Sequence, residues 1–261
     1  MIKVGLSTLF CLSKSFKSMI KEIKEFNVDY IEFVDEGLHK LNLKRIKILK
    51  KISEEMGVKT TVHAPFADVN IASPVKIFRR KILERLKKSI MYASQLESEI
   101  WIFHPGLKTG LSMFYPSLDW KINLDSVRIL AEYAESMDIK IAIENMPKNV
   151  PAVLKNPEDF AEFFKELDLD VGFVLDVGHA HMSGSIMEFL KKLKDKLTYM
   201  HIHDNNGKID SHMAIGTGTI DWDNVVKAIM QIKYDGIITL EVIEDVRESI
   251  VKFRKLISRH V

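Results

Sequence analysis

The feature of this sequence that most constrains its fold is a strict alternation of short apolar or β-branched runs with longer stretches of helical periodicity. Parallel neighbouring strands need a crossover connection, usually a helix, so this alternation predicts a parallel sheet. We expect strands at Lys3–Ser7, Tyr30–Val34, Lys59–His63, Ile100–His104, Lys140–Glu144, Val171–Asp176, Thr198–His201 and Gly236–Glu241. We expect the intervening helices at Ser15–Phe26, Leu41–Met56, Pro74–Leu96, Leu124–Met137, Pro157–Leu167, Ser185–Leu193, Trp222–Ile232 and Val246–Ser258.

The number of strand–helix units and the chain length favour a closed barrel. Eight units in 261 residues match the eightfold α/β barrel, which typically has about 250 residues. The alternative, an open doubly wound sheet, is typically accompanied by a glycine-rich phosphate loop after the first strand. Here the first strand runs into STLFCLSKS, which contains no glycine. No linker divides the chain, so we predict one α/β domain over residues 1–261, a single (β/α)8 TIM barrel.

Composition excludes several classes of protein. The formal net charge is +2, too small to indicate a nucleic-acid or membrane partner by itself. No uninterrupted apolar run approaches the roughly 20 residues that span a bilayer. The single cysteine, Cys11, excludes an internal disulfide and argues against a cysteine-based zinc site. The opening residues MIKVGLSTLF do not have the pattern of a secretion signal, so we expect a cytoplasmic protein.

Six consecutive strands, the third to the eighth, end in residues that can bind metal ions. The motifs are VHAPF, IFHPG, IAIENMP, FVLDVGHAH, YMHIHDN and IITLEV, and the segment IDSHMAIGTGTIDW follows the seventh strand. Seven of the nine histidines fall within these motifs. The candidate ligands are His63, His104, Glu144, Asp176, His179, His201, Asp204, Asp210, His212 and Glu241.

In a (β/α)8 barrel the carboxyl ends of all strands converge on one pocket, where catalytic groups of such enzymes lie. A single histidine beside an apolar run is usually a hydrogen-bonded core residue. Six strand ends that all carry imidazole or carboxylate groups are different, because burying so many polar groups together is costly unless something neutralises them. A divalent metal ion does so directly, so the sequence predicts a metal site.

Taken in order along the chain, these motifs resemble the xylose isomerase-like barrel superfamily. The matching segments are VHAPF…NIAS, FHPG, IENMP, LDVGHA, HIHDN…DSH…GTGTIDW and the terminal LEV. The superfamily includes sugar isomerases and epimerases, and also the endonuclease IV repair enzymes. The resemblance covers essentially the whole chain, and it does not by itself choose between these reactions.

Resemblance to the epimerase branch implies one metal ion on Glu144, Asp176, His201 and Glu241. Three carboxylates and one imidazole suit Zn²⁺, Mn²⁺, Co²⁺ or Mg²⁺. Such an enzyme stabilises an enediolate on the metal while its two glutamates, Glu144 and Glu241, remove and return a carbon-bound proton. The substrate is a sugar or sugar phosphate. The residues that would contact it are His63, His104, His179, His212, Phe66 and Trp222.

Resemblance to endonuclease IV implies three zinc ions and a role in cleaving DNA at abasic sites. His63, His104 and Glu144 would hold one ion, the four epimerase-type ligands a second, and His179, Asp210 and His212 a third. His212 favours this alternative, because many sugar epimerases carry an arginine at the comparable place.

Several segments depart from the endonuclease pattern, and these are segments that shape the DNA groove. Val177 and Gly178 stand where the endonucleases usually have threonine and cysteine, and HIHD replaces their H-x-N-D motif. We therefore favour a sugar isomerase or epimerase with one to three ions, and DNA is expected as a partner only under the alternative. A third possibility is a non-catalytic barrel that binds metal or sugar. Related barrels often pair, so a homo-oligomer is also possible.

Overall fold

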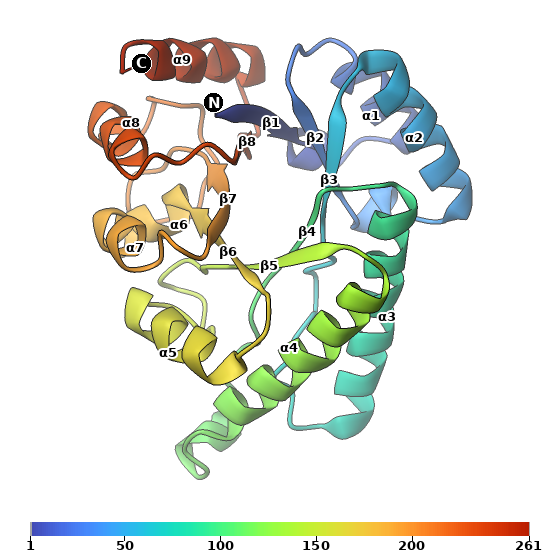
Figure 1. Cartoon of the computed structure of the whole chain (residues 1–261), viewed down its shortest axis with the longest axis vertical. Coiled ribbons are helices and arrows are strands. Elements are labelled where there is room, and N and C mark those ends of the chain that lie inside the picture. The colour runs from blue at the N-terminus through green and yellow to red at the C-terminus, as the bar shows by residue number, and fades with distance from the viewer. Residues whose placement is uncertain (1, 261) are drawn as a thin grey trace.

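The computed structural model describes residues 2–260, and the expected domain limits, residues 1 and 261, lie outside them. Within the described residues, eight parallel strands close into a barrel in the order of the sequence, and β8 pairs back with β1 (Figure 1). The predicted TIM barrel is thereby confirmed. The strands are β1 (Lys3–Ser7), β2 (Tyr30–Val34), β3 (Lys59–His63), β4 (Ile100–Phe103), β5 (Lys140–Glu144), β6 (Gly172–Asp176), β7 (Leu197–Ile202) and β8 (Ile237–Leu240).

Helices surround the barrel and cover the outer face of the strands (Figure 1). The α-helices are α1 (Phe16–Ile23), α2 (Leu43–Met56), α3 (Lys76–Gln95), α4 (Leu118–Ser136), α5 (Pro157–Leu167), α6 (Val177–Met182), α7 (Ile186–Lys192), α8 (Trp222–Gln231) and α9 (Val246–Ser258). Short 3-10 helices follow three of the strands: η1 (Thr8–Cys11), η2 (Gly37–His39) and η3 (Gly110–Met113).

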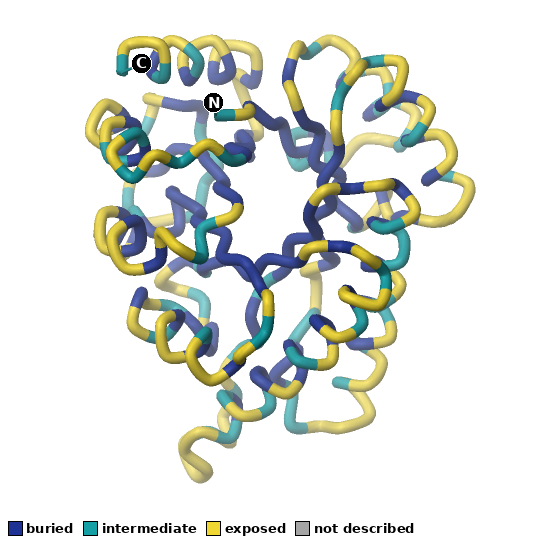
Figure 2. Tube along the Cα trace, in the orientation of Figure 1, coloured by how far each residue is buried: buried dark blue, intermediate teal, exposed yellow. Residues whose placement is uncertain are grey.

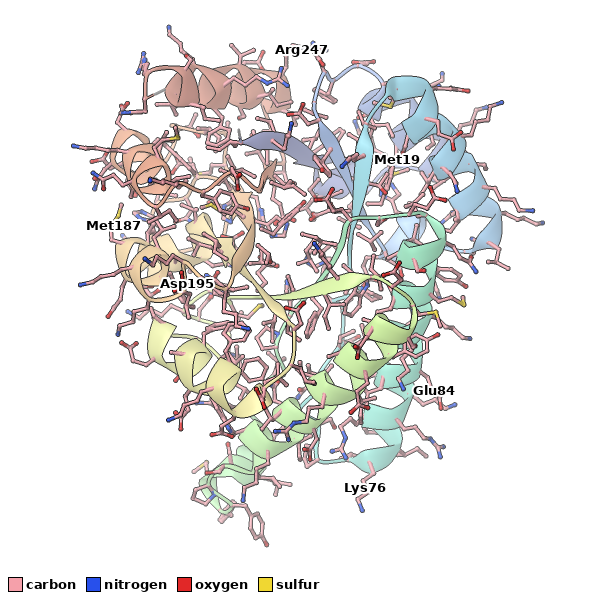
Figure 3. All side chains as sticks on the ribbon, in the orientation of Figure 1. Met19, Lys76, Glu84, Met187, Asp195 and Arg247 are labelled. Carbon is pink, nitrogen blue, oxygen red and sulfur yellow. The ribbon has the colours of Figure 1, made fainter. Side chains whose placement is uncertain are left out.

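The strands are buried almost throughout, whereas the helices other than the short α6 bury only one side (Figure 2). Every residue of β2, β4, β6 and β8 is buried, as expected for strands covered on both faces. The main hydrophobic core lies between the strands and the helices and includes Trp101, Phe160 and Phe253. On the outer side of α3, Lys76 and Glu84 extend away from the barrel (Figure 3).

Strand register places the polar strand ends at one rim of the barrel. Asp176 on β6 pairs with His201 on β7, and His201 pairs with Thr239 on β8. His63 on β3 pairs in turn with Ile102 on β4. Because all strands run in the same direction, the residues that end them meet at this rim.

One helix begins well before its predicted start. We expected it to begin at Leu124, but α4 begins at Leu118. The first turns of α4 bury two polar residues, Asp119 and Asn123, at positions where an apolar residue would be expected. The sequence therefore shows no apolar periodicity over these turns. Asp119 accepts hydrogen bonds from the Thr109 backbone N–H and hydroxyl, and Asn123 accepts one from the Gly106 N–H.

Other element limits differ from the predictions by only a few residues. Helix α6 was not predicted, because its six residues VGHAHM are too few to show helical periodicity. His104, predicted to end the fourth strand, follows β4 instead. Within residues 2–260, no helix is both long and apolar enough to cross a membrane.

Candidate metal centre

Four buried side chains at the rim of the barrel form a compact group of potential ligands. Glu144 ends β5, Asp176 ends β6, His201 lies near the end of β7 and Glu241 directly follows β8. One ligand atom from each of the four lies within 4.8 Å of the others. Carboxylate and imidazole groups gathered in this way match the donor sets of Zn²⁺ and Mn²⁺ sites. We call these four residues the central group.

Local hydrogen bonds fix the backbone that carries the central group. The Asn145 side chain accepts a bond from the Asp176 N–H at 2.8 Å and donates one to the Asp176 carbonyl at 3.0 Å. The Asp176 carboxylate accepts from the His179 N–H at 2.7 Å and thereby caps helix α6. The ends of β5 and β6 are consequently tied together directly beneath the site.

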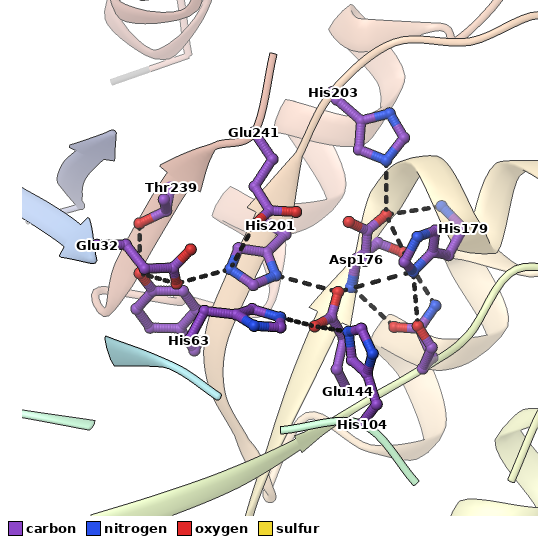
Figure 4. Close-up of polar contacts among 12 residues, drawn as sticks. Glu32, His63, His104, Glu144, Asp176, His179, His201, His203, Thr239 and Glu241 are labelled. Carbon is purple, nitrogen blue, oxygen red and sulfur yellow. Dashed lines mark hydrogen bonds and ion pairs between the residues drawn. The ribbon is translucent and has the colours of Figure 1, made fainter. Parts of the chain in front are cut away.

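Four histidines lie around the Glu144 carboxylate, and the most distant is His179, whose Nδ1 is 3.6 Å from Oε1 (Figure 4). His201 Nδ1 lies 3.1 Å from the same Oε1 atom, and His63 Nε2 and His104 Nε2 lie 3.4 and 3.3 Å from the Oε2 atom. His63, His104 and Glu144 form a second compact group of potential ligands. Burial alone would raise the pKa of Glu144, but the neighbouring histidines hold it well below its usual value.

A third group, which we call the loop group, joins α6 to the segment after β7. It consists of His179, His203, Asp210 and His212. Asp210 Oδ2 lies 3.0 Å from His179 Nε2 and 3.5 Å from His212 Nε2, while its Oδ1 lies 3.3 Å from His203 Nε2. The His203 and His212 rings stack with centroids 4.1 Å apart.

The polar atoms of the site fit a bound cation better than they fit one another. Among the described residues, five buried side-chain atoms of the site make no well-directed hydrogen bond, although three of them have an oppositely charged or histidine partner at 3.3–3.4 Å. They are Glu32 Oε1, Glu144 Oε2, Asp176 Oδ2, His203 Nε2 and Asp210 Oδ1. An unsatisfied buried polar group costs about 1–3 kcal/mol, and more when charged. Four of the five belong to the groups described above, so metal ligation would satisfy them.

Burial and mutual charge also perturb the protonation of the site. Burial, together with the charges of Glu32 and Glu144, raises the pKa of Glu241 to about 7, against the opposing effect of His201. Burial alone would lower the pKa of His201, but the carboxylates of Glu241, Glu32 and Glu144 raise it well above its usual value. Strongly shifted groups that meet in one cleft are typical of functional sites.

A cavity of about 200 Å³ opens onto these groups. Its polar lining includes both Glu144 and Glu241. Its apolar lining consists of Leu9, Val34, Phe66, Met146, Pro147 and Val150. A lining that combines apolar side chains with a few convergent polar groups is usual for small-molecule sites.

The structure brings together most of the residues that the sequence singled out. The three ligand groups contain His63, His104, Glu144, Asp176, His179, His201, Asp210, His212 and Glu241. Phe66 lines the cavity.

Trp222 and Asp204 lie elsewhere. The indole N–H of Trp222 donates to Asp204 at 2.8 Å inside the protein, and Trp222 does not line the cavity. Asp204 also accepts bonds from backbone N–H groups of the loop after β7. The Trp222 indole packs in the core and anchors a loop, and its expected contact with substrate stays a prediction.

Two residues of the site were not predicted. Glu32 lies in the middle of β2, where its Oε2 is 2.9 Å from His201 Nε2. The sequence feature that could have indicated Glu32 is a carboxylate inside the apolar run YIEFV. His203 belongs to the loop group, and its signal was its spacing of two residues from His201 in HIHD, which places both on the same side of an extended chain.

Comparison with known proteins agrees with this geometry. A family model described as the xylose isomerase-like TIM barrel matches residues 20–256. The chain belongs to this family. Within the xylose isomerase-like family, it is 36% identical over 244 residues to the uncharacterised protein MJ1311 of Methanocaldococcus jannaschii, covering 92% of this chain and 83% of MJ1311.

Relatives with more informative names are sugar epimerases or similar to them. The crystal structure of a D-tagatose 3-epimerase-like protein matches with a TM-score of 0.92 and 35% identity, covering 99% of this chain and 98% of that one. The D-psicose 3-epimerase of Ruminiclostridium cellulolyticum is 24% identical over 236 residues, covering 87% of this chain and 78% of the enzyme. This xylose isomerase-like barrel is thus similar to isomerase- and epimerase-type enzymes.

Proposed function

We propose that this protein is a metal-dependent sugar isomerase or epimerase, in which Glu144 and Glu241 exchange a proton at a carbon next to the substrate carbonyl. The observation that carries the proposal is the buried central group, whose four donor atoms lie within 4.8 Å of one another. Both glutamates of this group also line the cavity. Similarity to D-psicose 3-epimerase and to a D-tagatose 3-epimerase-like protein supports the same reaction class.

Glu144, Asp176, His201 and Glu241 would hold the ion, with Zn²⁺ or Mn²⁺ the first candidates and Co²⁺ or Mg²⁺ further ones. When bound, a divalent ion polarises a carbonyl oxygen and stabilises the negative charge that develops as the adjacent C–H proton leaves. The protein side chains would bind and orient the sugar and transfer the proton.

The two glutamates are suited to proton transfer from different directions. β5 and β8 are separated in the barrel by β6 and β7, so Glu144 and Glu241 reach the cavity from different sides. Glu241 is buried beside the cavity, and a carboxylate there can both accept a proton from a bound substrate and return it. His63, His104, His179 and His212 line the cavity and would bind sugar oxygens, while Phe66 would cover an apolar face of the ring.

The cavity favours a small sugar without a phosphate group. Its volume of about 200 Å³ is below the roughly 300–1,000 Å³ of sites for drug-sized ligands. Among the described residues that line it, none is a lysine or arginine. Its histidines face carboxylates, as His63 faces Glu144 at 3.4 Å and His179 faces Asp210 at 3.0 Å. A free ketose should therefore react faster than its phosphate ester.

Exchange of carbon-bound hydrogen with solvent tests the proposed reaction. The metal-loaded protein would be incubated with a panel of free and phosphorylated ketoses in heavy water, and deuterium at the carbon next to the carbonyl measured by NMR. Glu241→Gln should abolish incorporation even at metal concentrations that restore occupancy, because the amide cannot accept the proton. If no sugar exchanges, or if Glu241→Gln exchanges as fast as the native protein, the proposal is wrong.

The number of ions separates this function from the nuclease alternative. The second and third ligand groups, His63–His104–Glu144 and the loop group, are the observation that keeps the alternative open. We propose that one tightly bound ion per chain supports epimerase chemistry and that the additional histidines bind substrate. Three tightly held zinc ions, together with cleavage of an abasic-site duplex at about 1 s⁻¹ or faster and no exchange into sugars, would reverse this assignment.

A further inference from the structure

Glu32 is a buried carboxylate that lies outside the three ligand groups. It is the central residue of β2, in the run Tyr30–Val34, and it is fully buried. Its Oε2 atom is 2.9 Å from His201 Nε2 and also accepts a hydrogen bond from the Tyr199 hydroxyl at 3.1 Å. Figure 4 shows Glu32 on the side of the His201 ring that faces away from Glu144. A carboxylate in this place needs an explanation, because burying a charge is costly.

The two nitrogens of His201 face different partners. Nδ1 lies 3.1 Å from Glu144 Oε1, while Nε2 lies 2.9 Å from Glu32 Oε2. Glu241 Oε1 is farther from Nε2, at 3.6 Å. An imidazole binds a metal ion through a nitrogen that carries no proton, and the hydrogen bond made by the other nitrogen decides which one that is.

From this geometry we infer that Glu32 is a positioning residue for the metal centre. It accepts a hydrogen bond from Nε2–H of His201, which leaves Nδ1 without a proton and directed at the ion. The inference rests on the metal centre of the proposed function, and it assigns a task to a residue outside the ligand set. Carboxylates that orient a ligating histidine also raise its basicity.

A purely structural ion pair between Glu32 and His201 would leave different traces. Such a pair would stabilise the fold equally, whichever nitrogen of His201 binds the metal. A positioning residue must affect metal affinity and the protonation pattern of the ring in the metal-loaded protein. The two readings therefore differ in quantities that can be measured without any sugar substrate.

The first experiment uses the native chain loaded with ¹¹³Cd²⁺ and labelled with ¹⁵N-histidine. With the His201 ring assigned from its backbone resonances, we expect coupling between ¹¹³Cd and Nδ1, and a proton on Nε2 that exchanges slowly with solvent. Cadmium coupled to Nε2 of His201 would overturn the inference but leave the proposed function intact. Failure of the protein to bind cadmium at all would contradict both.

The second experiment compares variants by competition for Zn²⁺ with a chelator. Glu32→Gln keeps the size of the side chain and removes its charge, and we expect it to weaken zinc affinity by about 10–100-fold, as is typical for such partners. The matched control is Tyr199→Phe, which removes the hydroxyl that donates to the same Glu32 oxygen but leaves the contact with His201.

The control should bind zinc within about threefold of the native protein. Circular dichroism and thermal melting would establish that both variants fold. Equal zinc affinity for native and Glu32→Gln protein would overturn the inference. If Glu32→Gln does not fold, the cadmium spectrum of the native protein still decides the question.

Discussion

At the scale of single residues, Glu241 illustrates the cost of building this site. It is 5% exposed, and burial and neighbouring carboxylates raise the pKa of its side chain from 4.5 to about 7. Its charged form is therefore disfavoured in the folded protein but not in the unfolded chain. As pH rises from 4.5 to 7, the unfolded chain loses this proton first, so the free energy of unfolding falls across this window.

Glu241→Gln should consequently stabilise the protein after its metal has been removed with a chelator. One pKa unit corresponds to about 1.4 kcal/mol, so the gain at pH 8 should reach up to about 3 kcal/mol. The gain should shrink toward pH 4.5, where the native carboxyl is already protonated. Urea denaturation of both proteins at pH 5 and pH 8 measures this, and equal stabilisation at both pH values would contradict the stated origin.

At the scale of elements, the loop between β7 and α8 depends on one carboxylate. Asp204 accepts hydrogen bonds from the N–H groups of Asn205, Gly216 and Ile220 and from the indole of Trp222. Gly218 packs so closely that a Cβ atom there would collide with this carboxylate. The same loop carries Asp210 and His212, so Asp204 fixes half of the loop group without belonging to it.

Asp204→Asn should therefore destabilise the fold by about 3 kcal/mol, because an amide leaves two buried donors facing its NH₂ group. It should also weaken any metal binding by the loop group while the central group still binds. Asp221→Asn is the matched control, since Asp221 caps α8 with one bond to the Asn224 N–H and asparagine is an equally good cap. Denaturation and metal analysis test both points, and a neutral Asp204→Asn would refute the anchoring role.

The same elements show how far sequence reasoning reaches. Strands buried on both faces appear as apolar runs, and the rim residues follow those runs directly, so both could be predicted. The start of α4 could not be predicted, because the buried side chains of Asp119 and Asn123 accept hydrogen bonds from loop N–H groups. Glu32 was missed for a related reason: its partner His201 is 169 residues away, and only barrel closure brings the two together.

At the scale of the whole molecule, a bound metal ion should link several strands and thereby stabilise the folded barrel. The central group joins β5, β6, β7 and the residue after β8, so the ion binds the folded barrel and not the unfolded chain. Free metal at 100 times its dissociation constant adds about 2.7 kcal/mol of stability. For a domain of about 250 residues this raises the melting temperature by roughly 5–10 °C.

Calorimetry of native protein with Zn²⁺ or Mn²⁺, and then with a chelator, measures this increase and its reversal. Glu144→Gln should lose most of the increase, because an amide offers the cation no negative charge. Lys24→Gln, which changes an exposed ion pair on α1's C-terminal side, should retain it. An unchanged melting temperature for native protein in saturating metal would exclude a structural contribution of the ion.

Closure of the barrel between β1 and β8 also sets the order of events during synthesis on the ribosome. The central group draws its donors from Glu144 to Glu241, and the last strand to enter the ring, β8, immediately precedes Glu241. A nascent chain that has released β1 to β7 still lacks both the closing strand and the fourth donor. Chains fold as their segments emerge, so this protein acquires its full set of central donors only after β8 and Glu241 have left the ribosome.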